Sequence, residues 1–259
     1  MFESLKRRND YRKRNYESGY IGWELITDLK RYEWEKREYR TFLRRIDGAI
    51  TEENVDELSF YIELLKKEVK YSAMLELYRG NSKERFMYPF HKFNDVLLNY
   101  HDPRRKAEVD LSQKCLISAP WKRSRYIHML SHLQKEKFPY DPSNHMAIYY
   151  DTLDLACAYN GLHSLAISSY QEEGTMQASY YDTEQIFPYL TVENDLAFVY
   201  DTQKVRESLK KRKIDILPWE QELNVRVYGT DYRLLLIYTL SRMKFFILQR
   251  LKGLKENEK

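Results

Sequence analysis

The feature that most constrains the fold is the pair Asn160-Gly161, which separates two segments of different hydrophobic period. Before it, residues 153–159 form a short apolar run with the length of a buried strand. After it, residues 162–173 place apolar and small side chains at helical spacing, and Gly174 ends that segment. Because glycine permits tight backbone turns that other residues avoid, the pattern predicts a strand that turns directly into a helix at this pair.

Short apolar runs on both sides of this pair predict a small sheet. Strands are expected at residues 114–118, 146–150, 153–159, 176–181, 186–190 and 196–200. Pro120 suits the first turn of a helix, and residues 125–134 after it have one apolar face at helical period. We therefore expect an α/β core over residues 114–201.

Both ends of the chain are predicted to be helical. In residues 1–113, Thr51 is expected to cap a helix with one apolar face. That face is formed by Val55, Leu58, Ile62, Leu65 and Val69. Near the other end, a long final helix is expected from Thr230 or Asp231 to about residue 252, apolar on much of its circumference. The expected fold class is α+β, with an N-terminal helical region (1–113), a small mixed-sheet core (114–201) and a C-terminal helical region (202–259).

Composition and charge restrict the class of protein. The 259 residues are 43% hydrophobic and 32% charged, so the chain can bury a core and remain in water. Its most apolar stretch, residues 234–251, is interrupted by three basic residues, which leaves no span of about 20 apolar residues. Cys115 and Cys157 are too few for a disulfide framework or a zinc motif, and the first residues lack the apolar stretch of a signal peptide. We therefore expect a cytoplasmic protein without a membrane partner.

A strand that turns into a helix at glycine is a recurrent binding site for anions. The N–H groups of the first helical turn point outward, and the helix dipole favours negative charge there. His163 and Ser164 lie in this first turn, where their side chains can reach the same ligand. From the spacing alone, the alternative to a binding site is a turn with a purely structural role. The same alternative applies to Asn144-His145, which stands between a loop and a strand.

The order of these motifs resembles the superfamily that contains ParB amino-terminal domains and sulfiredoxin. The matching segments are PWKR at residues 120–123 with the helix after it, YNGLHSLA at 159–166, and MQASYYD at 176–182. The combination of Pro-Trp-x-Arg, Ser-Asn-His and Asn-Gly-x-His-Ser also looks like an uncharacterised bacterial and phage domain family. The resemblance covers about residues 115–182. It implies a ParB/sulfiredoxin-like core that binds a nucleotide or phosphate at the Asn-Gly turn.

Two positions depart from the pattern of that superfamily. Sulfiredoxin-like chemistry needs a cysteine where this chain has Leu162, which argues against sulfinic-acid reduction. ParB-like phosphate binding uses arginines in and near the turn, and Ser164 stands at one of those positions, so that only His163 remains. Our hypothesis is that Arg123 or Arg125 supplies the missing positive charge from the start of the preceding helix.

One functional hypothesis is a ParB-like nucleotide- or phosphate-binding protein that acts on nucleotides or nucleic acid. The sequence leaves its cofactor open, with a nucleotide and magnesium as one candidate. Histidine titrates near neutral pH, so His163 and His145 are the candidate catalytic acid or base. The candidate ligand-binding residues are Asn160, Gly161, Ser164, Asn144, Pro120, Arg123 and Arg125. Whether the protein is an enzyme is left open by the sequence.

The other hypothesis is a non-catalytic interaction protein, such as a phage or mobile-element modulator of a host system, that uses the fold as a scaffold. Its helical ends would contact a protein partner or a second copy of the chain. Basic clusters at residues 6–14 and 210–213 leave nucleic-acid contact open as well. No metal site is predicted, because His128 and His132 share a helical face without a third ligand.

Overall fold

The structure is a computed structural model that describes residues 37, 39–75, 105–120, 122–133, 138–193, 197–200, 203, 204, 207, 211, 226–228 and 232–257. Its contacts divide the chain into two units, residues 1–44 and 45–259. The helices are α3 (Arg40–Thr51), α4 (Val55–Leu75), α6 (Arg123–Leu133), α7 (Leu162–Gln171), the 3-10 helix η3 (Thr183–Gln185) and α9 (Tyr232–Asn257). The strands are β1 (Lys106–Asp110), β2 (Cys115–Ile117), β3 (Met146–Tyr150), β4 (Leu155–Asn160), β5 (Thr175–Tyr181), β6 (Leu190–Glu193), β7 (Ala197–Tyr200) and β8 (Arg226–Tyr228).

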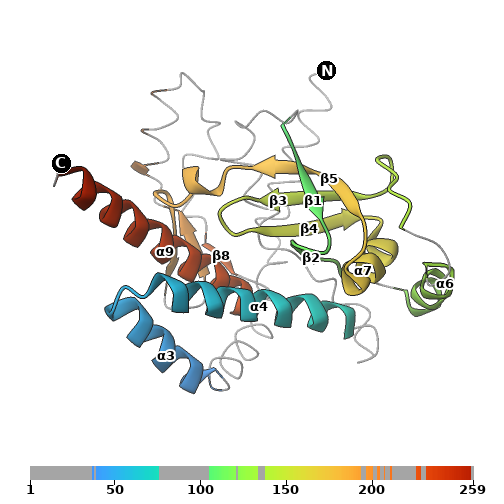
Figure 1. Cartoon of the computed structure of the whole chain (residues 1–259), viewed down its shortest axis with the longest axis horizontal. Helices are drawn as coiled ribbons and strands as arrows, with labels where there is room; N and C mark the ends of the chain where they lie inside the picture. The colour runs from blue at the N-terminus through green and yellow to red at the C-terminus, as the bar shows by residue number, and fades with distance from the viewer. Residues whose placement is uncertain are drawn as a thin grey trace. The chain divides into compact units, whose positions relative to one another are not determined.

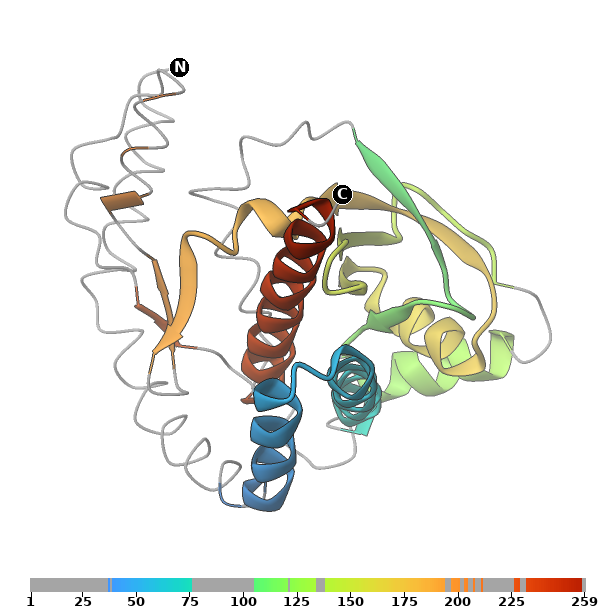
Figure 2. The same cartoon turned by 60° about the vertical axis from the view of Figure 1, so that its left-hand side comes forward.

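A five-stranded mixed sheet forms the centre of the second unit, in the order β1-β5-β3-β4-β2. The pairs β2–β4 and β3–β5 are parallel, whereas β1–β5 and β3–β4 are antiparallel. Helix α7 packs against β2 and β4, and α6 lies beside α7, as Figures 1 and 2 show. Strands β6, β7 and β8 form a separate antiparallel sheet. Helices and a mixed sheet together confirm the predicted α+β class.

The core of the larger sheet is filled by small and branched side chains. Its buried residues are Val109, Leu111, Leu116, Ala147, Ala156, Ala158, Leu165, Met176 and Ala178. The alanines of β3, β4 and β5 leave room for α7 to lie close to the sheet, and Ser169 Oγ donates a hydrogen bond of 2.8 Å to the Leu116 carbonyl. This close packing fixes where the first turn of α7 stands relative to the end of β4.

Most of the predicted elements around the Asn-Gly pair are confirmed. Strand β3 has the predicted bounds, and β2, β5, α6 and α7 agree within a few residues at each end. The predicted strand at 186–190 is wrong: residues 186–189 form a turn, and β6 begins at Leu190. Ile186 and Phe187 are apolar because they fill a core, where the Phe187 ring packs at 5.4 Å from Tyr238 of α9.

Two strands lie in regions for which the sequence pattern predicted only helices. Strand β1 falls within residues 1–113 and β8 within 202–259. In β1 only Val109 is fully buried, so a single apolar position was too little to separate the strand period from the helical one. Because β1 pairs with β5 at an edge of the five-stranded sheet, the sheet extends beyond the predicted boundary at residue 114.

Helix α4 begins one turn later than its predicted cap. Helix α3 continues to Thr51, whose Oγ1 donates to the Asp47 carbonyl at 2.8 Å instead of capping α4. Asn54 caps α4: its Oδ1 accepts the Glu57 N–H at 3.1 Å, and its Nδ2 donates to Glu57 Oε2 at 3.3 Å. The predicted apolar face is confirmed at Leu58, Ile62, Leu65 and Val69, all of them buried.

The long final helix packs within its own unit. Helix α9 packs against α4 and also contacts β6, and Figures 1 and 2 show α9 beside α4. Two side chains attach it to the start of β6 and to the turn before that strand: Tyr238 OH donates to the Leu190 carbonyl at 2.9 Å, and Arg242 Nε donates to the Phe187 carbonyl at 2.8 Å. Among the described helices, none is both long and apolar enough to cross a membrane. The predicted helices before residue 37, Trp121, and the basic clusters at 6–14 and 210–213 (apart from Lys211) lie outside the described residues.

Candidate functional site

The turn between β4 and α7 requires glycine for two reasons. Gly161 has φ 68° and ψ 28°, the left-handed conformation that residues with a Cβ rarely adopt. A Cβ on Gly161 would also lie only 2.6 Å from His145 Cδ2 and 2.9 Å from the Asn144 carbonyl oxygen. The predicted strand-to-helix turn is therefore present, and the segment 144–145 packs directly onto it.

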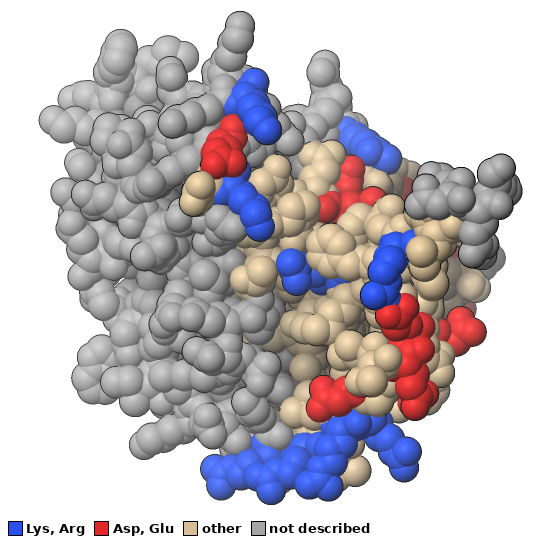
Figure 3. Space-filling model, turned by 90° about the vertical axis from the view of Figure 1, so that its left-hand side faces the viewer, with Lys and Arg blue, Asp and Glu red and all other residues tan. Residues whose placement is uncertain are grey.

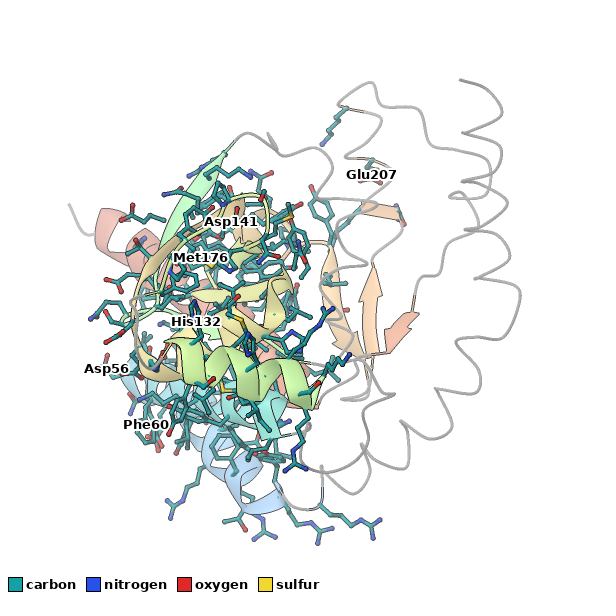
Figure 4. The ribbon with its side chains drawn as sticks, turned by 90° about the vertical axis from the view of Figure 1, so that its right-hand side faces the viewer. Asp56, Phe60, His132, Asp141, Met176 and Glu207 are labelled. Carbon is teal, nitrogen blue, oxygen red and sulfur yellow. The ribbon has the colours of Figure 1, made fainter. Side chains whose placement is uncertain are left out.

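His145 holds the turn through a chain of hydrogen bonds. Its Nδ1 accepts the Asp141 N–H at 3.0 Å, so the ring proton lies on Nε2, which is 2.8 Å from Ser164 Oγ. Ser164 Oγ in turn donates to the Gly161 carbonyl at 3.0 Å. Burial lowers the pKa of His145, against the opposing charge of Asp141. The neutral imidazole thus joins the 141–145 loop to the first turn of α7; Figure 4 labels Asp141 in that loop.

The side chain of His163 connects the first turn of α7 to the start of α6. Its Nε2 accepts the backbone N–H of Lys122 at 3.1 Å, which connects the first turn of α7 to the residue just before α6. Burial, and next the positive charge of Arg125, lower the pKa of His163. A second link runs from Ser118 Oγ to the Leu162 carbonyl at 2.7 Å.

Both predicted catalytic histidines are therefore tied to structural partners. His145 is 5% exposed and His163 is 9% exposed, and the hydrogen bonds above hold each ring. A general acid or base needs a ring nitrogen within reach of the substrate. A catalytic role for either histidine stays a prediction, and the geometry favours their positioning of the turn.

The starts of α6 and α7 meet at this junction and form an electropositive region. Neither helix has an acidic residue in its first turn, and no side-chain hydrogen bond caps the start of α7. Lys122, Arg123 and Arg125 are exposed at the start of α6, and Figure 4 shows this helix in front, with His132 labelled. The positive ends of two helix dipoles are thus combined with three cationic side chains.

The remaining predicted ligand residues take different positions around the turn. Asn144 and Asn160 are exposed at its surface, whereas Pro120 is buried below the start of α6. Ser164 is 7% exposed and is occupied by His145 and the Gly161 carbonyl. The structure therefore brings Arg123, Arg125 and the α7 first turn to one junction, but leaves Pro120 and Ser164 in supporting roles.

A second polar cluster lies at the other end of β4 and was not predicted from the sequence. Asp154 accepts hydrogen bonds at its Oδ1 from Lys114 Nζ at 2.7 Å and from Tyr149 OH at 2.6 Å. Lys66 of α4 is 1% exposed; it donates to the Leu153 and Asp154 carbonyls and forms ion pairs with Glu63 and Asp154. Although burial opposes it, the hydrogen bonds from Lys114 and Tyr149 lower the pKa of Asp154.

Asp151 makes a matching set of contacts in the same turn. Its carboxylate accepts Tyr180 OH at 2.6 Å, the Thr183 N–H at 2.8 Å and the Thr152 N–H at 2.7 Å. Burial and then this hydrogen bond raise the pKa of Tyr180 to about 12. The sequence signal for the neighbouring Asp154 cluster was Lys66, a charged residue that falls within the apolar face of α4.

Neither cysteine offers a reactive thiolate. Burial raises the pKa of Cys115 to about 12 and raises that of Cys157 well above its usual value. Within the described residues, no group of three or more His, Cys, Asp or Glu side chains could hold a metal ion.

Another basic surface is α3, where Arg40, Arg44 and Arg45 are exposed; Figure 3 shows Lys and Arg gathered at the lower edge of the face where α3 lies.

Comparison with known proteins gives one match. A family model with the description "Family of unknown function (DUF6710)" matches residues 24–226, which include the whole five-stranded sheet, α6 and α7. No curated protein and no solved structure matches the chain.

Proposed function

The chain belongs to DUF6710, a family of unknown function, and we propose that it binds a phosphate-bearing ligand, such as a nucleotide, at the junction of α6 and α7. The observation that carries the proposal is the convergence of two helix starts, joined by the hydrogen bond from Lys122 N–H to His163. Neither first turn contains an acidic residue, so no carboxylate of the turn itself offsets the positive end of the helix dipole. Such a junction favours an anion.

Each part of the junction has a distinct task in this proposal. The guanidinium groups of Arg123 and Arg125 would bind phosphate oxygens, since their planar donors fit two oxygens at once. The first-turn N–H groups of α7 would add further donors. Gly161, with no Cβ, lets the backbone hold its left-handed turn against Asn144. His145 and His163 would position this backbone as neutral groups, and the resemblance to ParB-like domains supports the same location for the ligand.

Isothermal titration calorimetry tests the proposal at low salt with inorganic phosphate and with ATP, each with and without magnesium. We expect binding that weakens about ten- to a hundredfold in Arg123→Ala or Arg125→Ala, because each loses a charge-assisted hydrogen bond worth about 1.5–3 kcal/mol. Lys106→Ala is the matched control, because Lys106 is exposed on β1 at the far edge of the sheet. Absence of binding, or unchanged affinity in both arginine variants, would falsify the proposal.

The pKa of His163 supplies a second, site-specific measurement. The charge of Arg125 helps to lower this pKa, so a bound phosphate that neutralises Arg125 must raise it. Titration of the imidazole by NMR, with and without phosphate, therefore reports binding at this junction and not elsewhere. A pKa that does not move at saturating phosphate would place the bound anion at another surface.

A second candidate function is that of a non-catalytic interaction protein. The observation that favours it is a set of large apolar side chains on the exposed face of α4. Exposed apolar side chains that line up along one helix usually mark a contact surface. This candidate and the binding of phosphate use different surfaces, so each can be tested without the other.

A further inference from the structure

Helix α6 has a polar side that continues from its junction with α7 toward the other end of the helix. This side includes the exposed residues Ser124, Arg125, His128 and His132. The intervals of three and four residues from Arg125 to His128 and on to His132 place these side chains in one row, because an α-helix has 3.6 residues per turn. Ser124 lies beside this row, one turn before His128. We call these four residues the α6 outer face.

The α6 outer face is separate from the side of the helix that the fold uses. Tyr126 is buried in a cluster with Ala166 and Ile167 of α7, and Met129 and Leu130 pack against that cluster. Figure 4 shows α6 at the front of the molecule in that view. The packing of α6 therefore leaves its outer face to a partner.

The charge of α6 fits an anion with several charges in a row. The helix contains no acidic residue, its first turn carries Arg123 and Arg125, and the exposed Lys122 precedes it. The positive end of the helix dipole lies at the same place. Guanidinium and imidazole N–H groups both donate hydrogen bonds to phosphate oxygens. A ligand with a chain of phosphates therefore matches the whole outer face.

We propose that the ligand of the α6–α7 junction is a nucleic acid whose strand runs from the junction along the α6 outer face, an inference that rests on the phosphate binding proposed above. The helix rises about 10 Å from Arg125 to His132. Phosphates of one helical strand follow each other at about 3.4 Å along the axis, so the row has room for about three nucleotides. A single phosphate at the junction would leave His128 and His132 without a ligand.

The outer face suits a nucleic acid better than a membrane. A helix that lies on a bilayer buries its apolar side in the lipid. The apolar side of α6 packs on α7 instead, and of the large apolar side chains described on α6 only Ile127 is exposed, at 49%. Lipid would gain little apolar contact from this helix, whereas backbone phosphates need only cations and hydrogen-bond donors.

Fluorescence anisotropy of the full chain with labelled oligothymidylates of one, three, six and twelve nucleotides, in 0.1 M salt, tests the inference. Contacts to backbone phosphates do not depend on sequence, so a homopolymer is a sufficient probe. The affinity should rise at least about tenfold from one nucleotide to six. The salt dependence should steepen over the same range, because each further phosphate contact releases counterions.

His132→Glu separates the outer face from the junction. It should weaken binding of the six-nucleotide probe at least about tenfold, because a carboxylate then faces a phosphate. It should change the affinity for inorganic phosphate less than about twofold, because charges about 10 Å apart are strongly screened at this salt concentration. His128→Glu should weaken binding of the six-nucleotide probe as well. Lys106→Glu, on the exposed edge strand β1, is the control and should change neither affinity.

The failure of this inference and that of the proposed function give different results. If neither phosphate nor any oligonucleotide binds, both are wrong. If phosphate binds but affinity does not rise with length, the junction takes a small ligand and the inference alone is overturned. The same holds if His132→Glu, folded by circular dichroism, leaves binding of the six-nucleotide probe unchanged. Equal competition by polyglutamate or by phosphatidylserine vesicles also overturns it, because the outer face would then not select a nucleic acid.

Discussion

The two ends of β4 have opposite chemistry. At the end before the strand, the carboxylates of Asp151 and Asp154 accept hydrogen bonds from Tyr180, Tyr149 and Lys114. At the end after the strand, two neutral histidines hold a glycine turn, and the start of α7 has no side-chain cap. One end carries carboxylates that link segments of the fold, and the other carries two helix starts with exposed arginines beside them.

This difference teaches which polar residues indicate a binding site. Hydrogen bonds and ion pairs at the Asp151–Asp154 end join α4, the β3–β4 turn and β5, so its charges stabilise the fold. At the Gly161 end both histidines make their hydrogen bonds within the fold, while Arg125 is exposed at the start of α6. A cluster of charged residues whose hydrogen bonds join separate segments of the fold is therefore a poor indicator of a binding site.

The largest expected effect is at the Gly161 end. Gly161→Ala should lower the free energy of unfolding by about 3 kcal/mol, because alanine is strained at φ 68° and its Cβ would clash with the Asn144 carbonyl. Urea denaturation measures the change. Gly253→Ala is the control, because nothing lies within 4 Å of a Cβ there and α9 should gain up to about 1 kcal/mol. Equal effects of the two substitutions would contradict the close approach at Gly161.

The next effect is at the opposite end of β4. Asp154→Asn should cost roughly 2 kcal/mol, because Lys66 and Lys114 lose part of their compensation in a partly buried network. Asp182→Asn serves as the control, since Asp182 accepts one exposed hydrogen bond, from Gln185. Thermal or urea unfolding of both variants measures the two losses of stability. If Asp154→Asn lowered the free energy of unfolding no more than Asp182→Asn, the cluster around Asp154 would not stabilise the fold.

Acid should affect the two ends in different pH ranges. Both His145 and His163 have a pKa lowered from 6.5 in the folded state, so the unfolded chain binds their protons more readily. The stability that the two neutral histidines contribute is complete above pH 6.5. It is lost as the pH falls below that value, by at most about 1.4 kcal/mol for each pH unit and histidine. The pKa of Asp154 is lowered from 3.8, so its contribution is lost only below that value.

Urea denaturation at a series of pH values from neutral to acidic measures this loss of stability. His145→Gln should reduce the slope of the free energy of unfolding against pH near pH 6, because glutamine cannot be protonated there. A stability that is constant from neutral pH to below 6 would show that the histidines are not held neutral.

The smallest effect concerns Arg125 in the absence of ligand. Arg125→Gln should raise the pKa of His163, since its charge contributes to the lowering, and should change stability by less than about 0.5 kcal/mol because its side chain is exposed. NMR titration of the imidazole checks the direction. A lower or unchanged pKa of His163 in the variant would mean that the charge of Arg125 does not lower this pKa.

The local pattern of residues predicted the elements that need no distant partner. The apolar run, the glycine and the small residues of α7 follow one another along the chain, so their strand, turn and helix were visible in the sequence. Strand β1 was not visible in the sequence, because it forms by pairing with β5, whose residues are far away along the chain. The same limit applies to the capping of α4: the sequence pattern predicted Thr51, but α3 continues to Thr51 and Asn54 caps α4 instead.

The sequence alone therefore determined the α+β class, the Gly161 turn and the apolar face of α4. Tertiary structure decided what each polar residue does: Lys66 meets Asp154 across 88 positions, and His163 meets the backbone of Lys122 across 41. The physical reason is that period and backbone preference are local properties. Burial, and with it the pKa and the partner of a side chain, depends on which segments pack together.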